Sequence, residues 1–324
     1  MEGRLGVRHH VHPAQIEQIG AYEIRDLRGR GQIANVYECR HIGLGRPAAV
    51  KLMHGHLAGD GNLKARFLRE VRALSRVSHP NVVEVFDVGE HRGAPYLVMS
   101  LVDGDDLADH FDHLQPMSVA AVADCVLPIV GGVVAAYDAG IVDRDLTPHN
   151  VRVSRDHRGA PSPKILDFGI SKLTGDEAGE KVLQTEGILR AANYVAPEQL
   201  CSTSRPHVRS DVYSLGAILY EAATGRPIFE ADTAHGLMQA IFAGDFALPS
   251  SVREDIPPAF DAIVLRALRR EPYERFSSAR ELGHALATLA TDPATWTSEF
   301  APSSGHRIAA RRSSGIQLGK RPRR

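Results

Sequence analysis

The feature that most constrains the fold of this chain is a change of sequence pattern near residue 100. Before it, short runs alternate apolar and polar residues and are separated by glycine-rich turns, a pattern typical of β-strands. After it, longer apolar segments have the spacing of helices. These patterns predict an α+β fold with two lobes, the first rich in strands and the second helical, joined by a hinge near residues 99–103.

The first lobe is expected to contain five strands and one helix. The strand-like runs are 22–30, 34–40, 47–53, 82–89 and 95–98. The helix is expected over 63–77, because its apolar residues recur at helical spacing. In the second lobe, helices are expected over 117–139, 208–224, 260–269 and 279–290.

Composition narrows the class of protein. A net charge of −1 does not favour nucleic-acid binding, and the three cysteines are far apart and form no CxxC, which argues against a disulfide framework or zinc site. No run of signal-peptide length begins the chain, and the longest apolar segment, 119–136, is interrupted by Asp124 and Pro128. We therefore expect a soluble, cytoplasmic protein without a membrane span.

The two ends differ in composition from the rest. Residues 1–20 have little periodicity and predict a disordered extension, with metal binding by His9, His10 and His12 as the alternative. Residues 301–324 hold seven Lys or Arg and no acid, which predicts a disordered basic tail that solubilises the chain or contacts an acidic partner. The expected boundaries are 1–20 for the extension, 21–290 for the folded domain, about 21–100 and 104–290 for its lobes, and 291–324 for the tail.

Three polar residues in the second lobe are the parts that phosphoryl transfer needs. Asp145 and Asn150 lie five apart in IVDRDLTPHN, and Asp167 follows in LDFGIS. Asp145 can accept the proton of an attacking hydroxyl, while Asn150 and Asp167 can hold Mg²⁺ on the phosphates. The DFG sequence alone is a weak signal, and the R-D-x-x-x-x-N spacing alone is a moderate one.

A glycine-rich segment in the first lobe fits the same chemistry. In LRGRGQIANVY, Gly29 and Gly31 let a hairpin lie close over phosphates, where a Cβ would collide. A plain hairpin turn is the alternative for an isolated GxG. The position of this glycine-rich segment ahead of AAVK, which ends at Lys51, favours the interpretation that the hairpin lies over phosphates.

Taken together and in this order, these motifs resemble those of protein kinases, and most of all the bacterial serine/threonine kinases. The resemblance covers about residues 22–290 and implies a two-lobed kinase-like fold that grips a nucleotide. It includes motifs that small-molecule kinases lack, namely ANYVAPEQL, SDVYSLGAILYEAATGRPIF and REPYERFSSARELGHAL.

The resemblance implies roles for the matching residues. Lys51 grips the α and β phosphates of ATP and is itself held by Glu70, with two unrelated surface residues as the alternative. Asp211 anchors the catalytic loop, and Glu198 pairs with Arg275 inside the helical lobe. The implied ATP-binding residues are Leu27, Gly29, Gly31, Val36, Ala49, Lys51, Met99, Leu101 and Arg152.

Further residues carry two interpretations each. Thr174 and Thr185 lie in the expected activation segment, where a phosphate on either could pair with Arg144; unmodified loop threonines are the alternative. His54 and His56, two apart after the Lys51 strand, could ligate a metal, or lie in a solvated loop.

Four positions depart from the family pattern. Asp143 replaces a His of the hydrophobic spine, and Thr147 replaces the Lys that neutralises the transferred phosphate. Arg152 replaces an aliphatic residue under the adenine and could lay its stem or its guanidinium plane there. Ala191 replaces a threonine whose hydroxyl would contact Asp145 and the substrate.

The resemblance therefore implies a serine/threonine kinase that transfers the γ-phosphoryl group of ATP to protein hydroxyls, its own included. Mg²⁺, with Mn²⁺ as an alternative, is the implied metal. The competing hypothesis is a pseudokinase scaffold that signals through its surface with weak or no nucleotide turnover.

Overall fold

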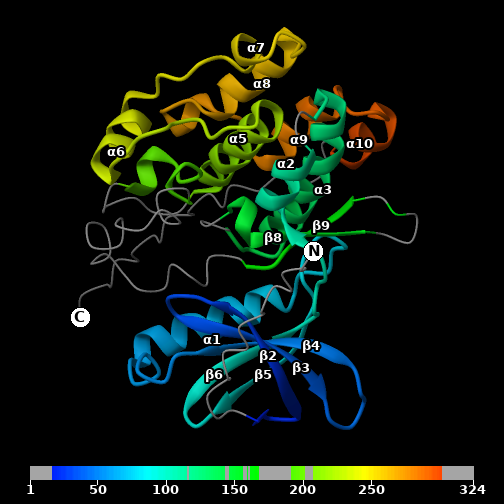
Figure 1. Ribbon diagram of the computed structural model, residues 1–324, viewed down its shortest axis with the longest axis vertical. Coiled ribbons are helices and arrows are strands. Elements are labelled where there is room, and N and C mark those ends of the chain that lie inside the picture. Colours follow the sequence, from blue (N-terminus) through cyan, green and yellow to red (C-terminus); the bar gives the residue numbers. More distant parts are fainter. Residues whose placement is uncertain are drawn as a thin grey trace, which may run out of the picture.

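The computed structural model describes residues 17–114, 117–142, 146–155, 159, 161–167, 191–200 and 207–300. They form two lobes stacked along the long axis of the molecule (Figure 1), so the predicted α+β architecture is confirmed. The strand-rich lobe ends at β6, and the helical lobe begins beyond the hinge at residues 100–104.

The first lobe is a six-stranded antiparallel sheet of order β1-β2-β3-β4-β6-β5. Its strands are β1 (Gln18–Ile19), β2 (Tyr22–Arg30), β3 (Ala34–His41), β4 (Pro47–Met53), β5 (Val85–His91) and β6 (Ala94–Met99). The five predicted strands are all present. The sequence missed β1, which lies in the segment predicted to be a disordered extension; for residues 18–19 that prediction is wrong, because they pair with Glu23 and Tyr22.

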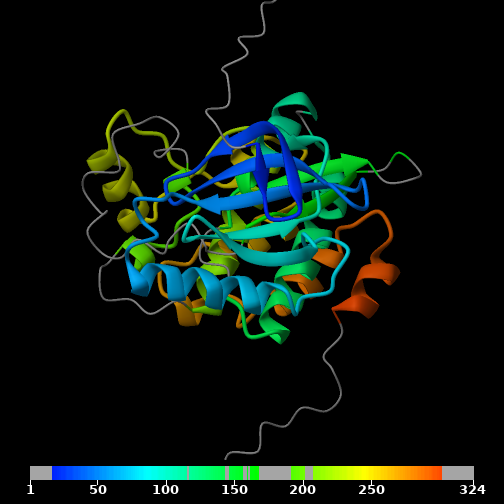
Figure 2. The ribbon, with the colours of Figure 1, turned by 90° about the horizontal axis from the view of Figure 1, so that it is seen from below.

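One helix, α1 (Gly61–Leu74), packs along the sheet, as Figure 2 shows from below. Asp60 caps its first turn by accepting hydrogen bonds from the backbone N–H groups of Asn62 and Leu63. Four buried apolar residues form its inner face: Leu63, Phe67, Val71 and Leu74. The helix ends three residues before the predicted position, at a turn in which the Val77 N–H donates to the Leu74 carbonyl.

The second lobe is built around α3 (Val119–Asp138). The other helices are α2 (Leu107–Leu114), α5 (Val208–Thr224), α6 (Ala234–Ala243), α7 (Pro249–Val252), α8 (Pro258–Ala267), α9 (Ala279–Ala287) and α10 (Pro293–Glu299). A three-stranded sheet, β7 (Asp105–Asp106), β8 (Val151–Arg155) and β9 (Pro161–Ile165), faces the first lobe. The sequence did not predict this small sheet.

Helix α3 is the one helix in the described part of the chain that is long and apolar enough to cross a membrane. It lies within the range 117–139 predicted for a helix, and it continues through Pro128. In the structure, 61% of the most apolar 18-residue stretch of this helix is buried inside the protein. Gly131 and Gly132 allow a close approach, because a Cβ at either would press against His79 or Ile165. The helix is thus the core of this lobe.

The segment from 291 to 300 was expected to belong to a disordered tail, and for this part the prediction is wrong. Residues 293–299 form α10, and Phe300 is 1% exposed. The Phe300 ring packs so close to Gly283 that a Cβ there would collide with it. Residues 301–324 lie outside the described residues.

A short link joins the lobes beside the hinge. Val82 forms a parallel bridge with Ile165, and the Val83 N–H donates to the Ile165 carbonyl at 2.9 Å. Asn81 completes the link by accepting a 2.9 Å hydrogen bond from the Ile165 N–H. Because β9 ends at this link, the residues that follow Ile165 are held opposite β4 of the first lobe.

Candidate active site

Lys51 and Asp167 meet across the space between the lobes. Lys51 lies on β4 between Val36 of β3 and Leu97 of β6, and it is only 8% exposed. Its ammonium pairs with Oδ2 of Asp167, which follows β9 in the other lobe. A buried ammonium requires such a partner, so the pair connects the lobes electrostatically.

The second carboxylate oxygen of Asp167 has a different environment. Oδ1 is buried and has no hydrogen-bond partner among the described residues. A carboxylate oxygen removed from water without a donor is unfavourable, unless a cation or another donor binds it. This oxygen therefore fits a metal ligand.

Asn150 lies beside Asp167 because of the β8–β9 pairing. Val151 is opposite Ile165, and one step beyond it the Leu166 N–H donates to the Asn150 carbonyl at 2.9 Å. The backbone positions that carry the Asn150 amide and the Asp167 carboxylate are thus close together at the end of this hairpin. Such a sparse set of oxygen ligands suits Mg²⁺, which keeps several waters and also binds substrate phosphates. Within the described residues, no cluster of three or more His, Cys, Asp or Glu side chains could hold a metal.

Glu70 is not paired with Lys51 in this structure. Its side chain, on α1, is 18% exposed and lies 3.3 Å from the Arg69 guanidinium. Lys51 pairs with Asp167 instead, so the predicted Lys51–Glu70 contact is not formed here. That a rotation of α1 would bring the two together stays a prediction.

The glycine-rich segment forms the tip of the β2–β3 hairpin. The Gly31 N–H donates to the Ala34 carbonyl at 3.0 Å, and a Cβ at Gly31 would lie 2.9 Å from that oxygen. Gly31 is therefore required by the turn. Gly29 has no such constraint, because a Cβ there would lie 4.0 Å from Val36. Packing among the described residues therefore does not require a glycine at position 29.

The remaining predicted nucleotide contacts lie along the edges of the same space. Ala49 and Met99 are directly paired on neighbouring strands, and both are buried. Leu27, Val36 and Leu101 are half-buried. These apolar residues come from β2, β3, β4, β6 and the hinge. Together they could enclose a flat apolar ring.

Arg152 occupies a position on β8 between the buried residues Val151 and Val153. Its Nη1 donates to the Gly104 carbonyl at 2.6 Å, so the guanidinium reaches the end of the hinge. Gly104 has a φ of +114°, and a Cβ there would collide with the Val153 carbonyl oxygen. Arg152 thus fixes a turn that only glycine fits.

Glu198 and Arg275 form the predicted ion pair in the helical lobe. Two parallel contacts join them, Nη2 to Oε2 at 2.7 Å and Nη1 to Oε1 at 2.8 Å. The Arg275 side chain is fully buried and also donates to the carbonyls of Arg209, Arg269 and Arg270. Burial raises the pKa of Glu198, but the hydrogen bonds and charge of Arg275, together with the Ser210 hydroxyl, hold it below its ordinary value.

Asp211 is fully buried on α5, where Oδ2 lies 2.8 Å from the Tyr137 hydroxyl of α3. This contact ties α3 to α5. The loop that Asp211 was predicted to anchor includes residues 143–145, which lie outside the described residues.

The comparisons with known proteins agree with this geometry. A model of the protein kinase domain matches residues 22–286. This chain belongs to the protein kinase family. Serine/threonine-protein kinase PknH of Mycobacterium tuberculosis is 34% identical over 274 residues, which cover 85% of this chain and 42% of PknH. PknL of the same species is 35% identical over 310 residues, covering 93% of this chain and 75% of PknL.

A solved structure is also similar. The kinase domain of Mycobacterium tuberculosis PknI has a TM-score of 0.64 and 26% identity, and the match covers 86% of this chain and all of that domain. The chain spans less than half the length of the PknH relatives that it matches. Kinases of this family use ATP and a divalent metal and act on proteins.

Several predicted residues of this kinase domain lie outside the described residues. They are Asp143, Arg144, Asp145, Thr174 and Thr185. Three of the four departures from the family pattern lie within the described residues, Arg152 among them. Thr147 is 5% exposed, and its carbonyl accepts a hydrogen bond from the Asn150 N–H; Ala191 is half-buried.

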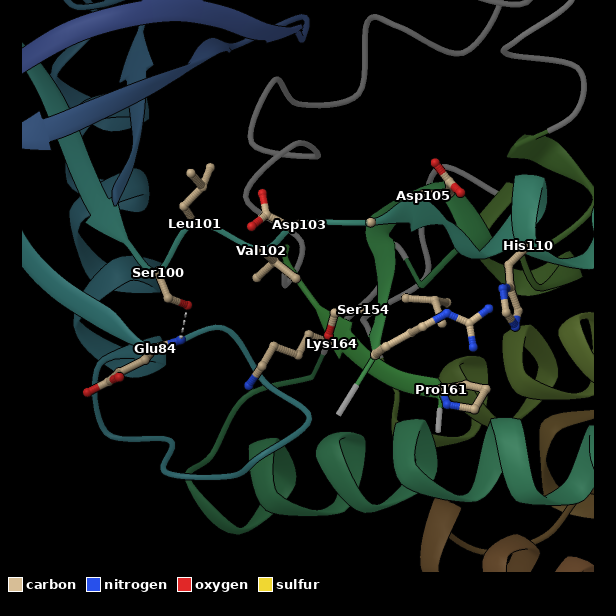
Figure 3. A pocket seen from close by; sticks show the side chains of 13 residues that line it. Glu84, Ser100, Leu101, Val102, Asp103, Asp105, His110, Ser154, Pro161 and Lys164 are labelled. Carbon is tan, nitrogen blue, oxygen red and sulfur yellow. Dashed lines mark hydrogen bonds between the residues drawn. The ribbon is translucent and has the colours of Figure 1, made fainter. Parts of the chain in front are cut away.

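A hollow of about 600 Å³ lies on the outer side of the hinge (Figure 3). Its walls include the hinge residues from Ser100 to Asp105 and Lys164 of β9. Lys51 and Asp167 are not among its lining residues. This pocket therefore shares Leu101 of the hinge with the predicted nucleotide contacts but does not include the Lys51–Asp167 pair.

Two contacts near the site were not predicted. His149 Nδ1 lies 3.1 Å from Asp106 Oδ2, beside Asn150, and the His54 ring contacts the tip of the glycine-rich hairpin. Each joins residues of different elements, and no sequence spacing indicates which of the many His residues makes such a contact.

Proposed function

We propose that this protein is a serine/threonine kinase that transfers the γ-phosphoryl group of ATP to protein Ser and Thr hydroxyls. The observation that carries the proposal is the Asp167 carboxylate, which pairs with Lys51 through one oxygen and keeps the other buried with no donor among the described residues. A carboxylate held in this way is ready to accept a metal cation. The names of the PknH and PknL relatives support the same activity.

Each residue would have a distinct role. Lys51 would hold phosphate oxygens, and Asn150 with Asp167 would hold Mg²⁺, which neutralises phosphate charge when bound. Asp145 would orient the acceptor hydroxyl and take its proton. Glu70 would stabilise Lys51 once the Asp167 carboxylate has bound the metal.

The competing function is a scaffold without turnover, and one observation favours it. In this structure Lys51 neutralises Asp167 directly, and the pair is only 10% and 15% exposed at its two side chains. A protein that never bound nucleotide would be stable in this arrangement. Thr147 also supplies a neutral hydroxyl where the family pattern has a cation.

Phosphate transfer from radiolabelled ATP distinguishes the two functions. The wild type should label itself or a generic protein substrate in the presence of Mg²⁺, and Asp145→Asn should lower the rate by a factor on the order of 10²–10³ or more without a change in Tm. Full activity in Asp145→Asn would contradict the assigned role. A wild type with no turnover and no nucleotide-dependent rise in Tm would favour the scaffold.

We also propose a cytoplasmic setting for this domain, where ATP is supplied and thiols stay reduced. Within the described part of the chain, Cys39 and Cys125 are free and buried, and burial raises the pKa of each to about 12. Such thiols stay protonated and unreactive. Thr174 and Thr185 would be the sites of autophosphorylation, and the basic segment 301–324 would contact an acidic partner.

A further inference from the structure

His54 contacts the tip of the glycine-rich hairpin at two points. It follows β4, three positions after Lys51. Its backbone N–H donates to the Ile33 carbonyl at 2.8 Å, and its ring Nε2 lies 2.8 Å from the Gly31 carbonyl oxygen. Because a carbonyl oxygen only accepts hydrogen bonds, Nε2 carries the proton and is the donor. The two bonds lie on either side of Gln32, the outermost residue of the turn.

The bond to Gly31 fixes the direction of a peptide group. In a planar trans peptide, the C=O of one residue and the N–H of the next point in opposite directions. With the Gly31 carbonyl directed at His54, the Gln32 N–H is directed away from it. Among the described residues, neither Gln32 nor Ile33 donates its N–H to a protein acceptor. Gln32 is exposed, whereas Ile33 is buried, so the Gln32 N–H is the one open to a ligand. An exposed backbone N–H in a glycine turn is a donor that an anion can bind.

We propose that His54 is a positioning residue that holds the tip of the glycine-rich hairpin in one conformation, so that the Gln32 N–H is aligned for the phosphates of ATP. The inference rests on the proposed function of the same site. A hairpin with glycines at 29 and 31 has many accessible conformations, and ATP would have to order it on binding. A side chain that orders the hairpin beforehand lowers that entropic cost.

The other interpretation of His54, a metal ligand shared with His56, does not fit the structure. The two rings are stacked, with centroids 5.5 Å apart and an angle of 14° between their planes. Nε2 of His54 is already bonded to Gly31, and the described residues hold no cluster of three metal-ligating side chains. His56 is exposed and makes no hydrogen bond to the hairpin among the described residues. His56 is therefore the matched control for substitutions of His54.

The test compares His54→Ala, His54→Gln and His56→Ala in the full chain. KM for ATP and kcat are measured separately, together with Tm without nucleotide. His54→Ala should raise KM about three- to tenfold, the loss of one neutral hydrogen bond, while kcat changes by less than about twofold. His54→Gln should restore most of the affinity, because its amide nitrogen is as many bonds from Cα as Nε2 is. His56→Ala should match the wild type.

Suppose that the wild type turns over ATP. An unchanged KM for ATP in His54→Ala would then overturn this inference and leave the proposed function intact. Equal losses of kcat and Tm that His54→Gln does not restore would show a merely structural role and would overturn it as well. If the wild type binds ATP without turnover, Kd for ATP replaces KM in the same comparison. A wild type that neither binds nor turns over ATP would overturn both the function and the inference.

Discussion

The Glu198–Arg275 and Lys51–Asp167 pairs are both buried ion pairs, but their remaining hydrogen-bonding groups differ. The Arg275 guanidinium has five contacts, two to the Glu198 carboxylate and three to backbone carbonyls. In contrast, Asp167 keeps one buried oxygen without a donor among the described residues. The first pair is complete within the described residues, whereas the second leaves one acceptor oxygen that those residues do not satisfy.

This difference separates a structural pair from a functional one. Desolvation of two charges is offset only when the remaining hydrogen-bonding groups are also satisfied, as they are around Arg275. A site that leaves an oxygen unsatisfied costs stability, and such costs concentrate where a ligand binds. Both pairs join elements far apart in the sequence, so ion pairing alone does not show which of them carries the chemistry.

The largest effect on stability is expected from breaking the complete pair. Arg275→Met leaves the Glu198 carboxylate without its partner and should lower the free energy of unfolding by about 3–5 kcal/mol. The exposed pair Arg25–Glu23, with its atoms 2.8 Å apart and both side chains about half exposed, is the matched control. Arg25→Met should cost less than about 1 kcal/mol. Urea denaturation of both variants measures the two values, and equal losses would contradict the distinction.

A smaller effect on stability is expected from substitution of two glycines, Gly104 in the hinge and Gly29 in the glycine-rich hairpin. Gly104→Ala places a Cβ against the Val153 carbonyl at a positive φ and should cost roughly 1–3 kcal/mol of stability. Gly29→Ala meets only open space within the protein, so its stability should stay within about 0.5 kcal/mol of the wild type. If the hairpin lies over the phosphates of ATP, as we propose, Gly29→Ala should still raise KM for ATP. A stability loss as large as that of Gly104→Ala would mean that Gly29 is structural.

The smallest effect concerns pH. The folded-state pKa of Glu198 is lowered from its ordinary value of 4.5, so its contribution to stability is present above that value and is lost as pH falls through the lowered pKa. The stability difference between the wild type and Glu198→Gln should therefore be constant near neutral pH and shrink below pH 4.5. Thermal unfolding of both proteins across this range provides the measurement. A difference that grows as the pH falls would reverse the assigned sign.

The sequence could predict contacts that belong to long, specific motifs. Glu198 and Arg275 lie 77 positions apart, and only the motifs around them indicate that they meet. The same kind of prediction was not met for Lys51 and Glu70, because the partner of Lys51 depends on where α1 lies relative to β4. That placement is a small difference in packing, which residue types alone do not determine.

Short elements could not be predicted for a different reason. β1 has two residues and α10 has seven, so neither offers enough residues for a periodic pattern. The segment around α10 is rich in Pro, Thr and Ser, and it packs against α9 through the buried Phe300 ring and a hydrogen bond from Arg280 to the Glu299 carbonyl. The His54 contact was missed because a ring bonded to a carbonyl leaves no periodic pattern in the sequence.

The central claim is that Asp167 holds a metal that brings ATP into the site, and a thermal-shift experiment tests it most directly. Wild type and Asp167→Asn are each melted with ATP, in the presence and absence of Mg²⁺. At ATP about 100 times its Kd, Mg²⁺–ATP should raise the wild-type Tm by roughly 5–10 °C, and ATP without Mg²⁺ should raise it much less. Asp167→Asn should lose the Mg²⁺-dependent part of the rise. The same Mg²⁺-dependent rise in both proteins would contradict the account.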